Sequence, residues 1–172
     1  MIGRNLGSYR IVGKMQDGGR APLYLGTDLS GDRPVCIKVL PEHLSQDPFD
    51  RRRFEINARA IARFKHNHVL PIYDYGEEND VAYIVMPYIP TGNLAVVIQK
   101  GSLPLDEVGR ILNQMAQALD HGHKLGILHT ELKPTNVLVD SDDNTYMMDF
   151  GISKLIRETA DIPVDFVPRS LA

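Results

Sequence analysis

The chain has 172 residues, a formal net charge of −3 and 24% charged residues. Its basic residues are scattered apart from a run at 51–53, so the sequence argues against nucleic-acid binding. Its single cysteine, Cys36, excludes an internal disulfide. Because no apolar run is long enough to span a bilayer, we expect a cytoplasmic protein, or the cytoplasmic part of a larger one.

The first half of the chain is predicted to be rich in strands. Five segments have the composition and turn-flanked pattern of strands: 9–12, 23–27, 34–40, 68–76 and 81–89. The glycine-rich stretch 13–22 suits a hairpin connection, and the acidic stretch 77–80 suits a turn. A helix is expected over 46–64, with Asp47 as its N-cap and Pro48 at its first position.

The second half is predicted to be mainly helical. A break at 90–94 is the expected boundary between two domains, 1–89 and 90–172. A long amphipathic helix is expected over 106–126, with Asp106 as its cap and Gly126 as its stop. Its predicted buried stripe consists of Val108, Ile111, Leu112, Met115 and Leu119. A polar loop and a hairpin that turns at 140–145 should follow.

Three motifs stand in a fixed order on these elements: VCIK at 35–38, HTELKPTNVL at 129–138 and DFG at 149–151. Together they resemble the signature set of protein kinases, and the sequence around them is most similar to that of bacterial Ser/Thr kinases. The resemblance covers residues 9–172. It implies an α+β kinase-like fold, with a complete β-rich N-terminal lobe (a five-stranded sheet and one helix). The helical C-terminal lobe would be incomplete and end in a truncated activation segment.

The resemblance also implies a site for ATP and magnesium. Lys38 would contact the α- and β-phosphates, Lys133 the γ-phosphate, and Asn136 and Asp149 the metal. The remaining nucleotide-binding positions would be Gly18, Gly19, Leu23, Cys36, Met86, Pro87, Ile89 and Leu138.

The departures from the family pattern fall on catalytic positions. Gln16 and Ala21 stand where the phosphate-binding loop has glycine, and Asn57 stands where the family has the glutamate that pairs with the strand lysine. The catalytic loop reads His129-Thr130-Glu131 in place of His-Arg-Asp. The extra methylene of Glu131 moves its oxygens by about 1 Å, and a misplacement of that size can cost about 100-fold in rate.

These observations favour a pseudokinase that binds ATP and magnesium weakly and acts by association or regulation. Two alternatives stay open: a weakly active Ser/Thr kinase that uses Lys38, Glu131, Asn136 and Asp149, and an interaction module that binds no nucleotide. We also expect the stripe at 108–119 to be partly uncovered, because the helices that would follow the activation segment are absent. A second copy, another protein or the tail 155–172 would then cover it.

Overall fold

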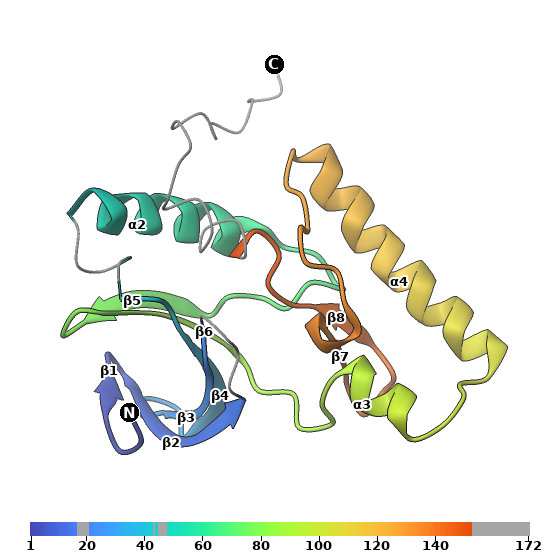
Figure 1. Cartoon of the computed structure of the whole chain (residues 1–172), viewed down its shortest axis with the longest axis horizontal. Coiled ribbons are helices and arrows are strands. Elements are labelled where there is room, and N and C mark those ends of the chain that lie inside the picture. Colours follow the sequence, from blue (N-terminus) through green and yellow to red (C-terminus); the bar gives the residue numbers. More distant parts are fainter. Residues whose placement is uncertain (17–20, 43, 45–47, 153–172) are drawn as a thin grey trace. The chain divides into compact units, whose positions relative to one another are not determined.

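The computed structural model describes residues 1–16, 21–42, 44 and 48–152, and the chain divides into two compact units (Figure 1). The first unit contains Met1–Arg63 and Pro71–Tyr88, and the second contains Phe64–Leu70 and the residues from Ile89 onward. The second unit therefore includes residues 64–70, which the sequence assigned to the first domain. Gly18, Gly19, Asp47 and the tail 155–172 lie outside the described residues.

The first unit contains an antiparallel sheet with the strand order β1-β2-β3-β4-β6-β5. Its strands are β1 (Asn5–Leu6), β2 (Tyr9–Gln16), β3 (Leu23–Asp28), β4 (Arg33–Val39), β5 (Asp74–Glu78) and β6 (Val81–Pro87). The sequence predicted five strands for this sheet, but the structure has six. The sequence missed β1, because this strand has two residues and carries no periodic pattern. One face buries a cluster that includes Leu6, Ile11, Val35, Ile37 and Val85.

The hairpin of β5 and β6 corrects two predicted boundaries. Asn79 and Asp80 have φ angles of 50° and 60°, as a two-residue hairpin turn requires at both positions. Glu77 and Glu78 therefore belong to β5, where they pair with Ala82 and Val81, and not to the turn. The strand begins at Asp74 and not at residue 68, because residues 68–70 are bonded to the second unit.

The helix α2 (Pro48–Arg63) begins with the proline that the sequence placed at its first position. It buries Phe54 and Ala58, and the Phe54 ring meets Tyr75 of β5 edge to face at 6.2 Å. Arg51 Nε lies 2.8 Å from Glu77 Oε2 on the same strand. These contacts fix the rotation of α2 on the sheet, so that Asn57 is half-buried and Glu55 is exposed.

The second unit contains α3 (Leu94–Gln99), α4 (Leu105–Lys124), the 3₁₀ turn η1 (Pro134–Asn136) and a hairpin of β7 (Val137–Val139) and β8 (Thr145–Met147). The sequence missed α3, which has six residues and is capped by the Asn93 side chain. Pro104 occupies the N-cap position of α4, so Asp106 lies in the first turn and is not the cap. Among the described residues, no helix is long and apolar enough to cross a membrane.

The apolar stripe of α4 is only partly buried by the described residues. Ile111 is buried, and Met115 and Leu119 pack against buried neighbours. Leu112 is 59% exposed, which corrects its assignment to the buried face. The buried side of the helix instead carries Ile111, Ala118 and Gly122. These residues are seven and four positions apart, and such spacings place side chains on one side of a helix.

Candidate functional site

Four of the predicted nucleotide-binding residues share one face of the sheet in the first unit. Cys36 and Lys38 are two residues apart on β4, so their side chains point to the same side. Leu23 of β3 is paired with Lys38, and Met86 of β6 is paired with Cys36. Cross-strand partners lie on the same face, so the sheet register alone gathers these side chains. Pro87 follows Met86 and is paired with Val35, on the opposite face.

Lys38 is 6% exposed. Lysine is almost never buried this deeply unless its ammonium group has polar or charged partners. Lys38 is therefore not an ordinary surface lysine, and its contact with phosphates stays a prediction. Asn57 lies half-buried on α2 in the same unit and brings an amide, not a carboxylate. The replacement of Gly by Ala21 lies at a buried position.

The second unit holds the polar loop 129–136 against the residue that precedes Asp149. His129 Nε2 donates to the carbonyl oxygen of Met148 at 2.9 Å, and the amide of Met148 donates to the carbonyl of Asn136, also at 2.9 Å. Asn136 Nδ2 donates to the carbonyl of Glu131 at 2.9 Å. The loop is thus bonded both to itself and to Met148, which determines where Asp149 follows.

The two predicted catalytic side chains, Glu131 and Lys133, contact each other. Glu131 Oε2 lies 3.7 Å from Lys133 Nζ, and both side chains are substantially exposed. Exposed pairs of this kind contribute little to stability because water and salt screen them. Thr130, in the position of the family arginine, is also exposed.

Asp149 and Phe150 occupy a constrained position at the end of β8. Asp149 has a φ of 65°, a left-handed backbone that non-glycine residues seldom adopt, and it is buried. The Phe150 ring lies 4.8 Å from Phe64 and 5.1 Å from His129, measured between ring centroids. The packing of Phe150 therefore holds the backbone on one side of Asp149, as Met148 does on the other.

Asn136 and Asp149 fit a magnesium ion by the chemistry of their donors. Both are buried, both offer hard oxygen atoms, and the bond from Met148 to Asn136 makes them neighbours within one unit. Among the described residues, no three His, Cys, Asp or Glu side chains form a metal-binding group. Phosphate and water oxygens would have to complete the coordination, as is usual for magnesium at nucleotides.

The other predicted nucleotide-binding residues of the second unit are Ile89 and Leu138, and both are half-buried. Leu138 lies on β7 and forms a bridge with Asn93, next to α3. The structure thus places Leu23, Cys36, Lys38, Met86 and Pro87 in the first unit, and Ile89, Glu131, Lys133, Asn136, Leu138 and Asp149 in the second.

Comparison with known proteins decides the family. The family model described as the protein kinase domain matches residues 9–168. The chain belongs to the protein kinase domain family. Its relatives include the Ser/Thr kinase PknE of Mycobacterium tuberculosis, 36% identical over 152 residues, and PrkC of Bacillus subtilis, 36% identical over 161 residues. These matches cover 88% and 92% of this chain, but only 27% and 25% of the relatives.

Solved structures agree with this assignment. Two crystal structures of the PknI kinase domain of Mycobacterium tuberculosis match with TM-scores of 0.74 and 0.73 at 28% identity. The matches cover 88% and 94% of this chain, and 62% and 70% of those chains. The kinase-like fold predicted from the sequence is therefore confirmed, and the chain spans part of the length of a kinase domain.

One residue that matters for packing in the second unit was not predicted from the sequence. Gly122 of α4 is buried, and a β-carbon there would lie 2.5 Å from Phe150 Cε1. The glycine therefore gives Phe150 room to pack against the helix. A signal was present, because an isolated glycine inside a helix costs about 1 kcal/mol relative to alanine and often marks a close approach.

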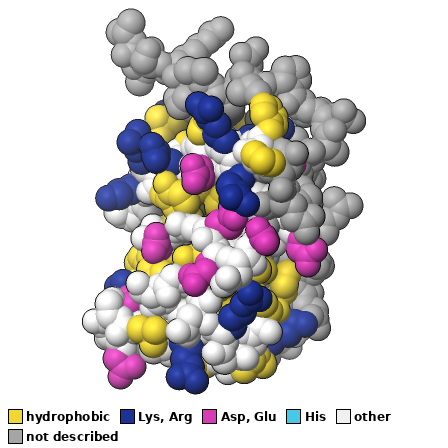
Figure 2. Space-filling model, turned by 90° about the vertical axis from the view of Figure 1, so that its left-hand side faces the viewer, with side chains coloured by type: hydrophobic (Ala, Val, Ile, Leu, Met, Phe, Trp, Pro, Cys, Tyr) yellow, Lys and Arg dark blue, Asp and Glu magenta, His cyan; other side chains and the backbone are white. Residues whose placement is uncertain are grey.

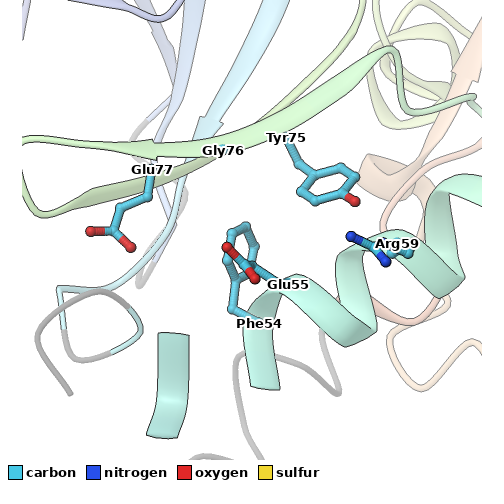
Figure 3. Close-up of a pocket in the computed structure, with 6 residues that line it drawn as sticks. All are labelled: Phe54, Glu55, Arg59, Tyr75, Gly76 and Glu77. Atoms are coloured by element: carbon cyan, nitrogen blue, oxygen red, sulfur yellow. The ribbon is translucent and has the colours of Figure 1, made fainter. Parts of the chain in front are cut away.

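A pocket in the first unit lies apart from the predicted nucleotide-binding residues. It has a volume of about 140 Å³ and lies between α2 and β5 (Figure 3). Its lining consists of Phe54, Glu55, Arg59, Tyr75, Gly76 and Glu77. Arg59 is hydrogen-bonded to Tyr75, which raises the pKa of the guanidinium, and Glu77 is paired with Arg51. The charge of Glu55 also acts on Arg59, so all four polar side chains of the pocket interact within the same unit.

Proposed function

We propose that this kinase domain binds ATP and magnesium weakly and is a pseudokinase, which acts through association or regulation. The observation that carries the proposal is that Glu131, at the position of the family's catalytic base, lies 3.7 Å from Lys133. The longer carboxylate side chain is oriented toward Lys133. A hydroxyl substrate would have to compete with that ammonium group for the carboxylate.

The proposed binding of nucleotide rests on the residues that match the family pattern. Lys38 would hold the α- and β-phosphates, Lys133 the γ-phosphate, and Asn136 and Asp149 the metal ion. When bound, magnesium would neutralise the charge of the phosphates. Leu23, Cys36, Met86 and Leu138 would contact the base, and the main chain of Pro87 and Ile89 would hydrogen-bond it.

The proposed loss of catalysis rests on the positions that depart from the family pattern. Positioning and electrostatics provide nearly all of the catalysis of phosphoryl transfer, so small displacements are costly. Glu131 has the wrong length, and Asn57 can hydrogen-bond Lys38 but cannot form an ion pair with it. Both changes make the positions of Lys38 and of the catalytic carboxylate less precise, but they leave the fold intact.

Thermal unfolding with ATP tests the binding. ATP with magnesium should raise the melting temperature, because a ligand that binds only the folded state stabilises it by mass action. Asp149→Ala should remove the part of the shift that depends on magnesium. Asp142→Ala is the matched control, since Asp142 is an exposed carboxylate of the β7–β8 turn. A folded protein without a shift at millimolar ATP would instead support the interaction module.

A weakly active Ser/Thr kinase remains the second candidate, and one observation favours it. The bonds of Met148 to His129 and Asn136 keep the loop and the start of the DFG motif together. Glu131 could then still orient a hydroxyl group, if only occasionally. Transfer of labelled phosphate that Glu131→Gln abolishes would favour this candidate over the pseudokinase.

We further propose that the exposed side of α4 contacts a second copy of the chain. Leu105 and Leu112 are 87% and 59% exposed and lie seven residues apart, with the half-buried Val108 between them. Asp106 and Glu107 lie in the first turn, and His123 and Lys124 in the last. An antiparallel pair of α4 helices would therefore place acidic groups against basic ones at both ends, in a two-fold arrangement.

We also propose that the protein is cytoplasmic and does not bind nucleic acid. A cytoplasmic location would fit the single cysteine, Cys36, because free thiols persist in reducing compartments. Nucleic acid remains an unsuitable partner. On the face drawn in Figure 2, the described basic side chains are interspersed with acidic and apolar ones.

A further inference from the structure

Three rings form a stack where residues 64–70 meet α4. The ring of His121, from the last turn of α4, lies 5.4 Å from Phe64 and 5.3 Å from His66, with interplanar angles of 12° and 28°. His121 is thus stacked between the other two rings. His68 lies on the far side of His66 at 5.7 Å. A single contact region therefore holds three imidazoles.

The hydrogen bonds of this region indicate which nitrogen atoms carry protons. His66 Nδ1 accepts from the amide of His68 at 3.1 Å, so this nitrogen carries no proton. His68 Nδ1 lies 3.1 Å from the carbonyl oxygen of Thr145 and donates to it. Protonation of His66 on Nδ1 would abolish its bond and place a cation next to two further imidazoles.

The titratable groups around His66 come from its own segment and from α4. His68 belongs to its own segment and His121 to α4. Burial and these two histidines together lower the pKa of His66. On α4, the hydrogen bond with Lys124, at 2.7 Å, lowers the pKa of Asp120, and the nearby charges of His123 and His121 lower it further.

The segment that carries His66 and His68 is bonded to the strand before the DFG motif. The amide of Leu70 donates to the carbonyl of Met147, and the amide of Met147 donates to the carbonyl of His68, both at 2.9 Å. Val69 forms a parallel bridge with Met147. Phe64, at the start of the segment, packs against Phe150.

We propose that His66 and His121 form a proton-sensitive joint in this kinase domain. With both imidazoles neutral, the stack holds residues 64–70 against α4 and β8. With His66 protonated, its hydrogen bond from His68 is lost and repulsion among the imidazoles separates the segment from the helix. Because the segment contacts Met147 and Phe150, acidification also loosens the residues on both sides of Asp149.

The direction of the effect follows from proton linkage. A histidine with a lowered pKa binds its proton less readily in the folded state than in the unfolded state. Its stabilising contribution is therefore complete above its ordinary value of about 6.5, and it declines as the pH falls through that value toward the lowered one. Aspartate and glutamate stay largely ionised above about pH 5.5, so a comparison of pH 7.5 with pH 5.5 isolates the histidines.

Amide hydrogen exchange of the whole chain tests the joint. Between pH 7.5 and 5.5, the protection factors of the Leu70 and Met147 amides should fall several-fold, after correction for the intrinsic pH dependence of exchange. His66→Asn should remove most of this fall, because the asparagine side-chain oxygen can replace Nδ1 as acceptor and does not titrate. His123→Asn should leave the fall unchanged, since His123 is exposed on the same helix turn and lies outside the stack.

Proton NMR of the unmodified chain gives a second measurement that needs no variant. His66 should titrate below the ordinary histidine value of about 6.5. A midpoint for His66 at or above that value would overturn the proposal. So would protection at Leu70 and Met147 that is independent of pH, or a His66→Asn variant that keeps the full fall.

Discussion

At the scale of a residue, the main-chain bonds of Met148 do not depend on the two loop positions that depart from the family's catalytic motif. Both main-chain groups of Met148 are bonded to the catalytic loop, through His129 and Asn136. Neither bond involves the side chain of Thr130 or Glu131. The residues at these two positions therefore leave both bonds of Met148, and with them the frame around Asp149, in place.

Gly122 gives a prediction at the same scale. In Gly122→Ala the new methyl group would lie 2.5 Å from Phe150 Cε1 and 3.0 Å from the carbonyl oxygen of Ile127. Overpacking of this kind costs about 1–3 kcal/mol, which should outweigh the better helix propensity of alanine. Denaturant unfolding should therefore show a lower free energy of unfolding.

Gly109→Ala is the matched control, because it makes the same change in the same helix. A β-carbon at Gly109 meets no described atom within 4 Å. This variant should gain up to about 1 kcal/mol from helix propensity. Equal effects of the two substitutions would show that the packing of Phe150 on α4 is not as described.

At the scale of elements, the sequence predicted what has a local pattern. The long helices followed from apolar spacing, five of the six strands of the first unit's sheet followed from composition and flanking turns, and the proline that begins α2 was placed correctly. It missed β1 and α3, which are too short for a periodic signal. Residues 64–70 were misassigned because their bonds with Met147 and their stack on His121 are contacts between distant parts of the chain. The motifs predicted Lys38, Asn136 and Asp149 as site residues, and their roles stay predictions. The isolated helix glycine at 122 signals a packing role, but its contact with Phe150 depends on the fold and not on the local pattern.

The exposed side of α4 carries the prediction at this scale. Leu112→Asp should shift the chain toward monomer in sedimentation at micromolar concentration, because it places a charge in the proposed apolar contact. Burial of a leucine is worth roughly 1.5–3 kcal/mol, and a two-fold contact involves each leucine twice. The unmodified chain should sediment as a dimer.

Gln117→Asp serves as the control, since it adds the same charge to an exposed position of α4 away from Leu112. It should leave the dimer intact. A chain that stays monomeric at these concentrations, or one that dissociates equally with either substitution, would argue against the α4 contact.

At the scale of the whole molecule, the chain is a protein kinase domain that spans about a quarter of the length of the Ser/Thr kinases it resembles. Each of its two units contains some of the predicted nucleotide-binding residues. The strand lysine, the loop asparagine and the DFG aspartate are retained, while the residues that would pair with Lys38 and accept a proton are altered. From this distribution we propose a nucleotide-binding pseudokinase, in which binding is retained and catalysis is lost or very weak.

The rate of phosphoryl transfer tests that claim most directly. The chain would be incubated with labelled ATP and magnesium at concentrations that raise its melting temperature, and phosphate incorporated into itself or a generic protein acceptor would be measured. Active protein kinases turn over at about 1–100 per second. We predict a rate lower than this by at least about 100-fold, the cost of a displacement of about 1 Å. Turnover near one per second in the unmodified chain would contradict the account.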